Sequence, residues 1–311
     1  MVRSVTDSAR DAISSTGQAL GESTVPAPRR PVRRLALSPS RASDFKQCPL
    51  LYRLRAVDRL PEKATKAQVR GTLVHAVLEE LFAKPAAERV PATAYALVEP
   101  AWQKLQQERP ELAEELFTGA EDPEQEPWLA SARGLLDSYF GLEDPRRLQP
   151  EACELLVETE LDNGVLLRGY IDRLDVAPTG EIRVVDYKTG NAPREIGEAK
   201  ALFQMKFYAL ALWKLRGVVP RQLQLMYLAN RETLKYAPDE AELRRFERLV
   251  SAIWQAILTA GRTGDFRPSR SRLCDYCNHK ALCPEFGGTP PAYPGWPEPT
   301  ADAETVLDRT D

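Results

Sequence analysis

The feature that most constrains the fold is a change in hydrophobic period near the middle of the chain. Apolar residues recur at helical spacing through 66–84, 92–117 and 128–140. The period then falls to two in three runs, at 152–161, 165–176 and 181–188. Turn sequences separate these runs, Asp-Asn-Gly at 162–164 and Pro-Thr-Gly at 178–180. We therefore predict helices first, and then three strands joined by tight turns.

The last part of the chain mixes both periods. A helix is expected at 198–216, a strand at 221–229 and a long helix at 240–260. Nearer the N-terminus, Ser38 and Pro39 are a helix cap and a first-turn proline, and they predict an additional helix start. This order predicts an α/β fold with a mixed central sheet flanked by helices, preceded by an N-terminal helical region.

The two ends of the chain differ from the middle in composition. Residues 1–35 contain Ser, Gly, Pro and Arg but no aromatic residue, so we expect a disordered basic arm. Residues 288–311 hold five prolines and an acidic end, so we expect a second disordered tail and one domain over 36–287. No apolar run reaches about 18 residues and no signal peptide is evident, which predicts a cytoplasmic protein without membrane spans.

The charge balance limits how this chain can bind nucleic acid. Its 45 acidic and 42 basic residues give a net charge of −3, so any such contact must come from a local patch. One candidate is the group at the end of the arm, Arg29, Arg30, Arg33 and Arg34. Another is the segment 262–280, where five bases face two acids around Phe266 and Tyr276. The alternative for both is an ordinary solvated run of charge.

Two aspartates and a lysine are expected to meet on the central hairpin. A symmetric turn centred on residue 179 pairs positions at equal distances from it, and Asp172 and Asp186 are such a pair. Their Cβ atoms would lie about 4.5–5.5 Å apart. Lys188 shares the face of Asp186 because it is two residues further along the strand. Facing carboxylates repel, and Mg²⁺ or Mn²⁺ between them would remove that repulsion. The alternative is a surface salt-bridge triad.

Two helices carry further candidate residues. His75 and Glu79 lie four positions apart on the 66–84 helix, and His75 is a candidate metal ligand from a facing element. Its alternative role is that of a half-buried structural histidine. Gln204 and Tyr208 have the same spacing on the 198–216 helix, where the alternative is a face packed on the sheet.

Four short motifs in order carry a resemblance to a known family. The sequence resembles the PD-(D/E)xK nuclease superfamily, in its RecB-type branch, whose core is restriction-endonuclease-like. The resemblance spans about residues 36–287. The motifs that carry it are Gly71-Thr72-Leu73-Val74-His75, Gly169-Tyr170-Ile171-Asp172-Arg173, Val185-Asp186-Tyr187-Lys188-Thr189-Gly190 and Gln204-Met205-Lys206-Phe207-Tyr208.

The resemblance implies roles for individual residues. The implied ligands of the catalytic Mg²⁺ or Mn²⁺ are His75, Asp172, Asp186 and the carbonyl of Tyr187. Lys188 is implied as the catalytic lysine. Gln204 and Tyr208 match a motif that lines the active site and supports the DNA strand. Glu158 and Glu160 are candidate additional acids.

The implied activity is metal-dependent hydrolysis of DNA, as an exonuclease on single strands or duplex ends in repair or recombination. The chain has no Gly-x-x-x-x-Gly-Lys-[Ser/Thr] phosphate loop, so it carries no helicase motor of that kind, and a separate helicase is a candidate partner. Two alternatives remain: a DNA-binding module with a vestigial nuclease site, and an iron–sulfur protein that senses redox state.

Four of the five cysteines form a suggestive set. Cys274, Cys277 and Cys283 are clustered, and Cys48 stands 226 positions before Cys274. Four thiolates could hold Zn²⁺ or an iron–sulfur cluster, His279 could replace one of them, and unrelated buried thiols are the alternative. The arrangement resembles the 4Fe–4S staple of AddB-type and CRISPR-adaptation nucleases, which implies such a cluster here. Cys153 lies on a predicted strand, on one face with Leu155 and Val157, and is expected in the core.

Overall fold

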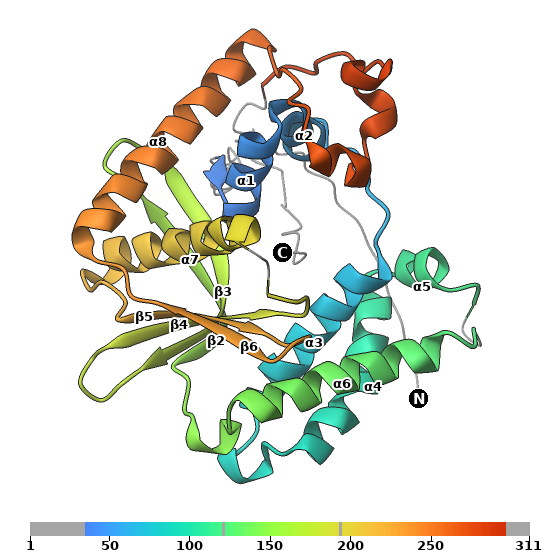
Figure 1. Cartoon of the computed structure of the whole chain (residues 1–311), viewed down its shortest axis with the longest axis vertical. Coiled ribbons are helices and arrows are strands. Elements are labelled where there is room, and N and C mark those ends of the chain that lie inside the picture. The colour runs from blue at the N-terminus through green and yellow to red at the C-terminus, as the bar shows by residue number, and fades with distance from the viewer. Residues whose placement is uncertain (1–34, 120–121, 193–194, 297–311) are drawn as a thin grey trace, which may run out of the picture.

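A computed structural model describes residues 35–119, 122–192 and 195–296 (Figure 1). The helices are α1 (Pro39–Gln47), α2 (Pro49–Tyr52), α3 (Lys66–Phe82), α4 (Pro91–Glu108), α5 (Glu111–Leu116), α6 (Gln125–Leu142), α7 (Glu195–Arg216) and α8 (Glu240–Thr263), with a short π-turn, η1 (Arg53–Val57), after α2. The strands are β1 (Ala36–Leu37), β2 (Ala152–Glu160), β3 (Leu166–Val176), β4 (Ile182–Lys188), β5 (Gln222–Tyr227) and β6 (Glu232–Tyr236). Among these described residues, no helix is both long and apolar enough to cross a membrane.

The six strands form one mixed sheet in the order β1-β3-β4-β5-β6, with β2 on the other edge of β3. The β1–β3 and β4–β5 pairs are parallel and the others are antiparallel. The predicted hairpin register is confirmed, because Arg173 pairs with Val185, six positions on either side of residue 179. Along one edge of β3, β1 pairs only with Leu166 and Leu167, and β4 pairs from Arg173 onward. Asp172 lies between these two stretches, where this edge of β3 is open.

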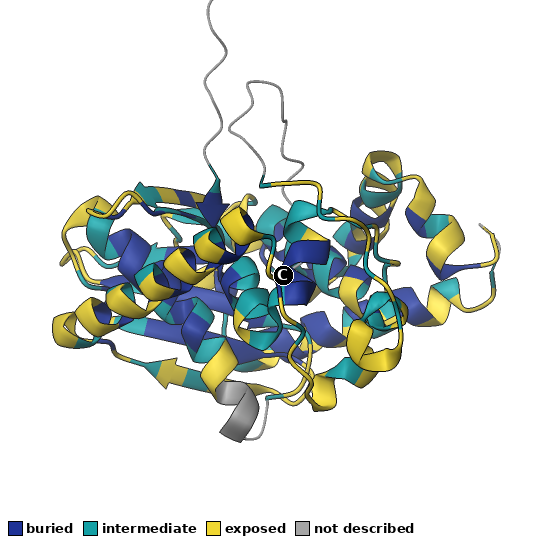
Figure 2. Cartoon of the chain, turned by 90° about the horizontal axis from the view of Figure 1, so that it is seen from above, coloured by how far each residue is buried: buried dark blue, intermediate teal, exposed yellow. Residues whose placement is uncertain are grey.

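Helices cover both faces of the sheet (Figures 1 and 2). On one face, α7 packs on the sheet and α8 packs on α7, and their buried residues form a first hydrophobic cluster with Ile171 and Val184. On the other face, α3, α4 and α6 pack on one another and form a second cluster with Val185 and Tyr187. Neighbouring residues of β4 therefore point into different clusters, as expected for a strand that is buried on both faces. The predicted α/β fold with a mixed sheet flanked by helices is confirmed.

Two expectations about elements were incomplete. The helical pattern at 92–117 is divided into α4 and α5 at Pro110, because a proline disfavours the helical conformation of the residue before it. The predicted strand at 221–229 is followed by β6, whose short and largely exposed sequence shows little alternation of apolar residues. β6 pairs with β5 as an edge strand.

The predicted disordered tail differs from the structure over residues 289–296, which we call the C-terminal strap. The hydroxyl of Tyr293 donates to the carbonyl of Gly261 at 2.6 Å. Trp296 lies so close to Gly261 that a Cβ there would be 2.1 Å from its ring. Arg53 of η1 also donates to the carbonyl of Pro291. The strap thus packs on the end of α8 and on η1, whereas residues 1–34 and 297–311 of the two predicted tails lie outside the described residues.

Candidate active site

The open edge of β3 brings together three of the predicted metal ligands. The Asp172 carboxylate accepts a hydrogen bond from the backbone N–H of Tyr187, with Oδ2 2.6 Å from the nitrogen. His75 Nε2 lies 2.9 Å from the Tyr187 carbonyl oxygen. His75 reaches the sheet from α3. This helix begins with a capping box at Thr65, and Val74 beside His75 is buried in the second cluster. The main chain of Tyr187 thus contacts both side chains.

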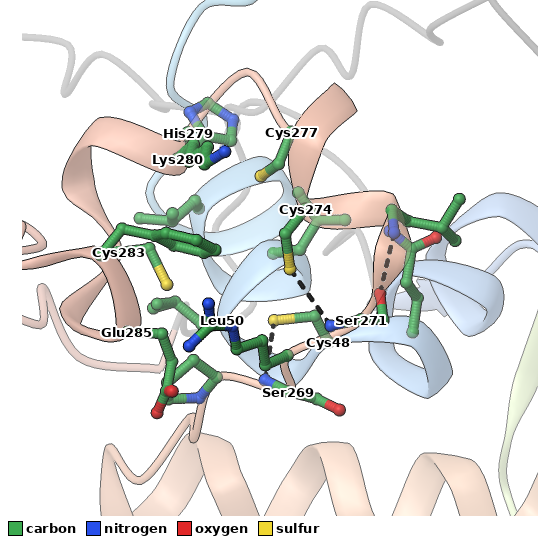
Figure 3. Close-up of a pocket in the computed structure, with 17 residues that line it drawn as sticks. Cys48, Leu50, Ser269, Ser271, Cys274, Cys277, His279, Lys280, Cys283 and Glu285 are labelled. Carbon is green, nitrogen blue, oxygen red and sulfur yellow. Dashed lines mark hydrogen bonds between the residues drawn. The ribbon is translucent and has the colours of Figure 1, made fainter.

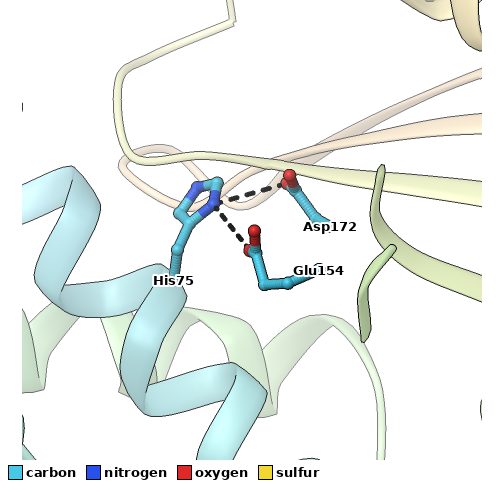
Figure 4. Close-up of side chains that lie close together, drawn as sticks. All are labelled: His75, Glu154 and Asp172. Carbon is cyan, nitrogen blue, oxygen red and sulfur yellow. Dashed lines mark ion pairs between the residues drawn. The ribbon is translucent and has the colours of Figure 1, made fainter. Parts of the chain in front are cut away.

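A second acid, Glu154, lies beside Asp172 and His75 and was not predicted. His75 Nδ1 lies 3.5 Å from Asp172 Oδ2 and 3.9 Å from Glu154 Oε1 (Figure 4). One ligand atom from each of the three side chains lies within 4.8 Å of the others. Of the acids that the sequence suggested on this strand, Glu158 instead forms an ion pair with Arg168 at 2.6 Å.

Glu154 escaped prediction because the backbone breaks the alternation of the strand there. Its φ is 48°, in the left-handed region that residues other than glycine rarely adopt. Cys153 therefore packs against the second cluster, whereas Leu155 and Val157 pack against the first. The expectation that all three share one face was wrong for this reason. Strand alternation contains no signal for such a change of face.

Asp186 and Lys188 form the second half of the site with α7. Lys188 Nζ lies 2.8 Å from Asp186 Oδ1 and donates to Gln204 Oε1 at 2.8 Å. Gln204 Nε2 in turn donates to Asp186 Oδ2 at 3.1 Å and to the Tyr208 hydroxyl at 3.2 Å. Asp186 is buried, with 1% of its surface exposed. The four residues predicted on the strand and the helix are therefore joined in one network.

Tyr208 combines features of both predicted roles. Its ring is buried, with 2% exposed, and packs on Gly169, where a Cβ would lie 2.8 Å from ring atom Cε1. This close approach is possible only because residue 169 has no side chain. The hydroxyl nevertheless reaches the active-site network through Gln204. Tyr208 is thus a packed helix residue that also orients a site residue.

Burial and mutual charge shift the pKa values in the first half of the site. Burial raises the pKa of Asp172 to about 7, although the charge of His75 opposes this rise. Burial alone would lower the pKa of His75, but the carboxylates of Asp172 and Glu154 outweigh it and raise the pKa to about 9. The site therefore holds protons that a bound cation would have to displace.

The four predicted cysteines line one pocket (Figure 3). Cys48 comes from the junction of α1 and α2, and the others come from the segment after α8. The backbone N–H of Ser269 donates to the Cys48 sulfur at 3.4 Å, and that of Ser271 donates to the Cys274 sulfur at 3.3 Å. All four thiols are free of disulfides.

Among the described residues, no three of these sulfurs lie within 4.8 Å of one another. Thiolates bound to tetrahedral zinc lie about 3.8 Å apart, since each Zn–S bond is about 2.3 Å. Within the described part of the chain, only the His75, Glu154 and Asp172 group brings three ligand atoms within 4.8 Å of one another. His279, the alternative ligand, lines the same pocket, and its Nε2 lies 2.8 Å from Glu62 Oε1.

Comparison with known proteins identifies the family. Residues 36–284 match the sequence model of the PD-(D/E)XK nuclease superfamily. The chain belongs to this superfamily. The membership expected from the four motifs is thereby confirmed, and the mixed sheet flanked by helices is consistent with a restriction-endonuclease-like core.

Relatives of this PD-(D/E)XK nuclease include proteins of mycobacterial viruses. The Gene 69 protein of Mycobacterium phage L5 is 26% identical over 288 residues, covering 80% of this chain and 96% of that protein. The Gene 69 protein of Mycobacterium phage D29 is 27% identical over 282 residues, with the same coverage of 80% and 96%. Among solved structures, a proposed exonuclease from Eubacterium rectale has a TM-score of 0.52 at 14% identity, covering 78% of this chain and 87% of that one. That structure supports the fold.

Membership makes this protein a phosphodiester hydrolase of a superfamily that uses divalent metals such as Mg²⁺ or Mn²⁺. The donor atoms at the open edge of β3 suit such ions, because carboxylate, carbonyl and imidazole groups converge there. The His75 ring turns Nδ1 toward the carboxylates of Asp172 and Glu154 and Nε2 toward the Tyr187 carbonyl oxygen.

Proposed function

We propose that this protein is a metal-dependent deoxyribonuclease that acts as an exonuclease on single strands or duplex ends, in DNA repair or recombination. The observation that carries the proposal is Lys188, which Asp186 and Gln204 hold at the end of β4. A vestigial site is disfavoured because His75, Asp172, Asp186 and Lys188 are all present and connected. A separate helicase would supply single strands, since the chain has no phosphate loop of its own.

In the proposed mechanism, His75, Asp172, Asp186 and the Tyr187 carbonyl hold the metal, with Glu154 beside them. When bound, such an ion polarises the scissile phosphate and lowers the pKa of water. The oxygen of a water forms the new bond to phosphorus, the bond from phosphorus to the leaving oxygen breaks, and the proton that the water releases ends on that leaving oxygen. The Lys188 ammonium stabilises the charge that develops on the phosphate.

Gln204 and Tyr208 are positioning residues in this mechanism. Gln204 bonds both Lys188 and Asp186, so it fixes the angle between the ammonium and the carboxylate. Tyr208 holds the amide of Gln204 through its hydroxyl. Because the Tyr208 ring is buried, it supports the substrate through Gln204 and not by direct contact.

We further propose that Cys48, Cys274, Cys277 and Cys283 hold a 4Fe–4S cluster. Two observations support this proposal: the cysteines share one pocket, and two of their sulfurs accept backbone N–H groups. The cluster would join segments far apart in the sequence and act structurally. A redox-sensing role is the second candidate, and nuclease activity that is equal in oxidised and reduced protein would exclude it.

The nuclease proposal is tested with end-labelled single-stranded and duplex DNA in Mg²⁺, Mn²⁺ or EDTA, with circular single strands as a substrate without ends. We expect metal-dependent loss of linear DNA and none in EDTA. Lys188→Ala should abolish cleavage, whereas the exposed control Lys235→Ala should cleave normally. Full activity of purified Lys188→Ala would refute the mechanism, and equal cleavage of circles would refute the exonuclease assignment.

A further inference from the structure

The cysteine-bearing segment carries a prominent exposed aromatic residue. Tyr276 has 86% of its surface exposed, and Leu273 has 50% exposed. Both belong to the 3₁₀ helix η4 (Arg272–Tyr276), in which side chains three positions apart eclipse one another. Leu273 and Tyr276 therefore share one face of this helix, and we call that face the Tyr276 ridge. An unpartnered apolar face of this kind indicates a binding surface.

The ridge is fixed in place from behind. Ser271 caps η4, because its hydroxyl accepts the backbone N–H of Leu273 at 3.2 Å. Cys274 and Cys277, also three positions apart, line the cysteine pocket. The tyrosine is thus held on a short, capped element, and little conformational entropy remains to be lost on binding.

The segment that carries the ridge is rich in bases, although the whole protein is acidic. Between 267 and 280 it holds Arg267, Arg270, Arg272 and Lys280, of which Arg267 pairs with Asp265 and Lys280 pairs with Asp275. The guanidinium of Arg270 lies 5.2 Å from the centre of the Phe286 ring, and Lys280 Nζ lies 4.7 Å from the same ring. Arg272 forms no ion pair with any described residue.

This alternation of aromatic side chains and cations is complementary to single-stranded nucleic acid. Unpaired bases stack on an exposed aromatic ring, and arginines bind the phosphates between them. A duplex presents no free base faces along its length and would gain only the charge contacts. Of the two aromatic residues noted in the sequence here, only Tyr276 is available, because Phe266 is buried against Tyr52 and Tyr293.

We propose that the Tyr276 ridge, with Arg270 and Arg272, is a second binding site that holds a single-stranded segment of the substrate outside the active site. One base stacks on Tyr276 and the flanking phosphates contact the two arginines. The inference rests on the proposed function only in taking DNA as the substrate. Beyond that function, the second site would bind the unpaired strand without taking part in its hydrolysis.

The test measures binding by fluorescence anisotropy with labelled oligonucleotides in EDTA, where no cleavage occurs. Tyr276→Ala should weaken binding of single strands by about 5- to 150-fold, the loss expected for one stacked base. Tyr276→Phe keeps the ring and should bind like the wild type. Leu249→Ala removes an exposed apolar side chain from α8 (44% exposed) and should have no effect. Arg272→Ala should weaken binding and flatten its salt dependence.

Equal metal content and equal visible spectra of all variants establish that the cysteine pocket is intact. If the wild type binds single strands through Tyr276 but cleaves no DNA, the second site stands and the proposed function fails. If the enzyme cleaves DNA while Tyr276→Ala binds single strands of every length like the wild type, the second site is refuted. The Tyr276 ridge would then be a binding surface for a protein. Failure of the wild type to bind any single strand refutes it as well.

Discussion

Replacement of Gly169 by alanine should reveal how closely the fold and the chemistry are linked. The new Cβ would lie 2.8 Å from Tyr208 Cε1, and real Cβ contacts are rarely shorter than 3.4 Å. The ring must therefore move by roughly 0.6 Å. Neither partner moves freely, because Tyr208 is buried and Gly169 is paired with Val157 in the sheet.

The displacement reaches the active site through two hydrogen bonds. The Tyr208 hydroxyl lies 3.2 Å from Gln204 Nε2, so a shift of that size takes the pair beyond hydrogen-bonding distance. Gln204, which bonds Lys188, then loses one of the contacts that orient its own side chain. We expect Gly169→Ala to cost about 1–3 kcal/mol in the free energy of unfolding, as overpacking does. The rate constant kcat should fall about 10- to 100-fold, since small misplacements of catalytic groups have effects of that size.

The assay compares initial rates on single-stranded DNA in Mn²⁺ with urea unfolding of the same samples. Gly134→Ala is the matched control, because no atom outside its own helix lies within 4 Å of the added Cβ. That control should gain about 0.5–1 kcal/mol of stability and keep full activity. In the Gly169→Ala background, Tyr208→Ala should cost less stability than it costs in the wild type, because removing the ring also removes the clash, and activity should not return. Wild-type kcat and stability in Gly169→Ala would refute the reasoning.

Three further predictions concern the metal and the cysteines. Glu154→Gln should weaken Mn²⁺ binding about 10- to 100-fold by calorimetry, whereas Glu158→Gln on the same strand should not, and equal affinities would remove Glu154 from the site. Apparent Mn²⁺ affinity should rise from about pH 7 to pH 9, because His75 and Asp172 hold protons below those values and must release them to bind metal; a flat profile would contradict the shifted pKa values. Cys48→Ala should yield protein without iron or labile sulfide, whereas Cys153→Ala, outside the pocket, should keep both; stoichiometric zinc in anaerobic wild-type protein would exclude the cluster but not the four-cysteine site.

What could be predicted from the sequence was local in origin. The pairing of Arg173 with Val185 follows from a short symmetric turn, and helical spacing alone placed Gln204 next to Tyr208. Four motifs in order were enough to indicate the superfamily to which residues 36–284 belong.

The features that escaped prediction depend on contacts between distant residues. Glu154 reaches His75 only because its backbone is left-handed, and that conformation is held by the pairing of β2 with β3. The C-terminal strap has the composition of a disordered tail, since its prolines conceal the packing of Tyr293 and Trp296 on glycines of α8. Composition averages over a segment, so it cannot predict that the Tyr293 and Trp296 rings pack on α8.

The strap has a consequence for the order in which this protein matures. Arg53 forms a buried ion pair with Asp58 at 3.0 Å, lies over the Tyr293 ring and bonds the Pro291 carbonyl, so the segment after Cys48 is anchored to the end of the domain without any sulfur ligand. A lone cross-link from Cys48 to Cys274 would restrict the unfolded chain by about 5 kcal/mol. Here side-chain packing already joins the two segments, so the proposed cluster would be added to a chain whose loop is closed. Its loss would then leave the two segments joined.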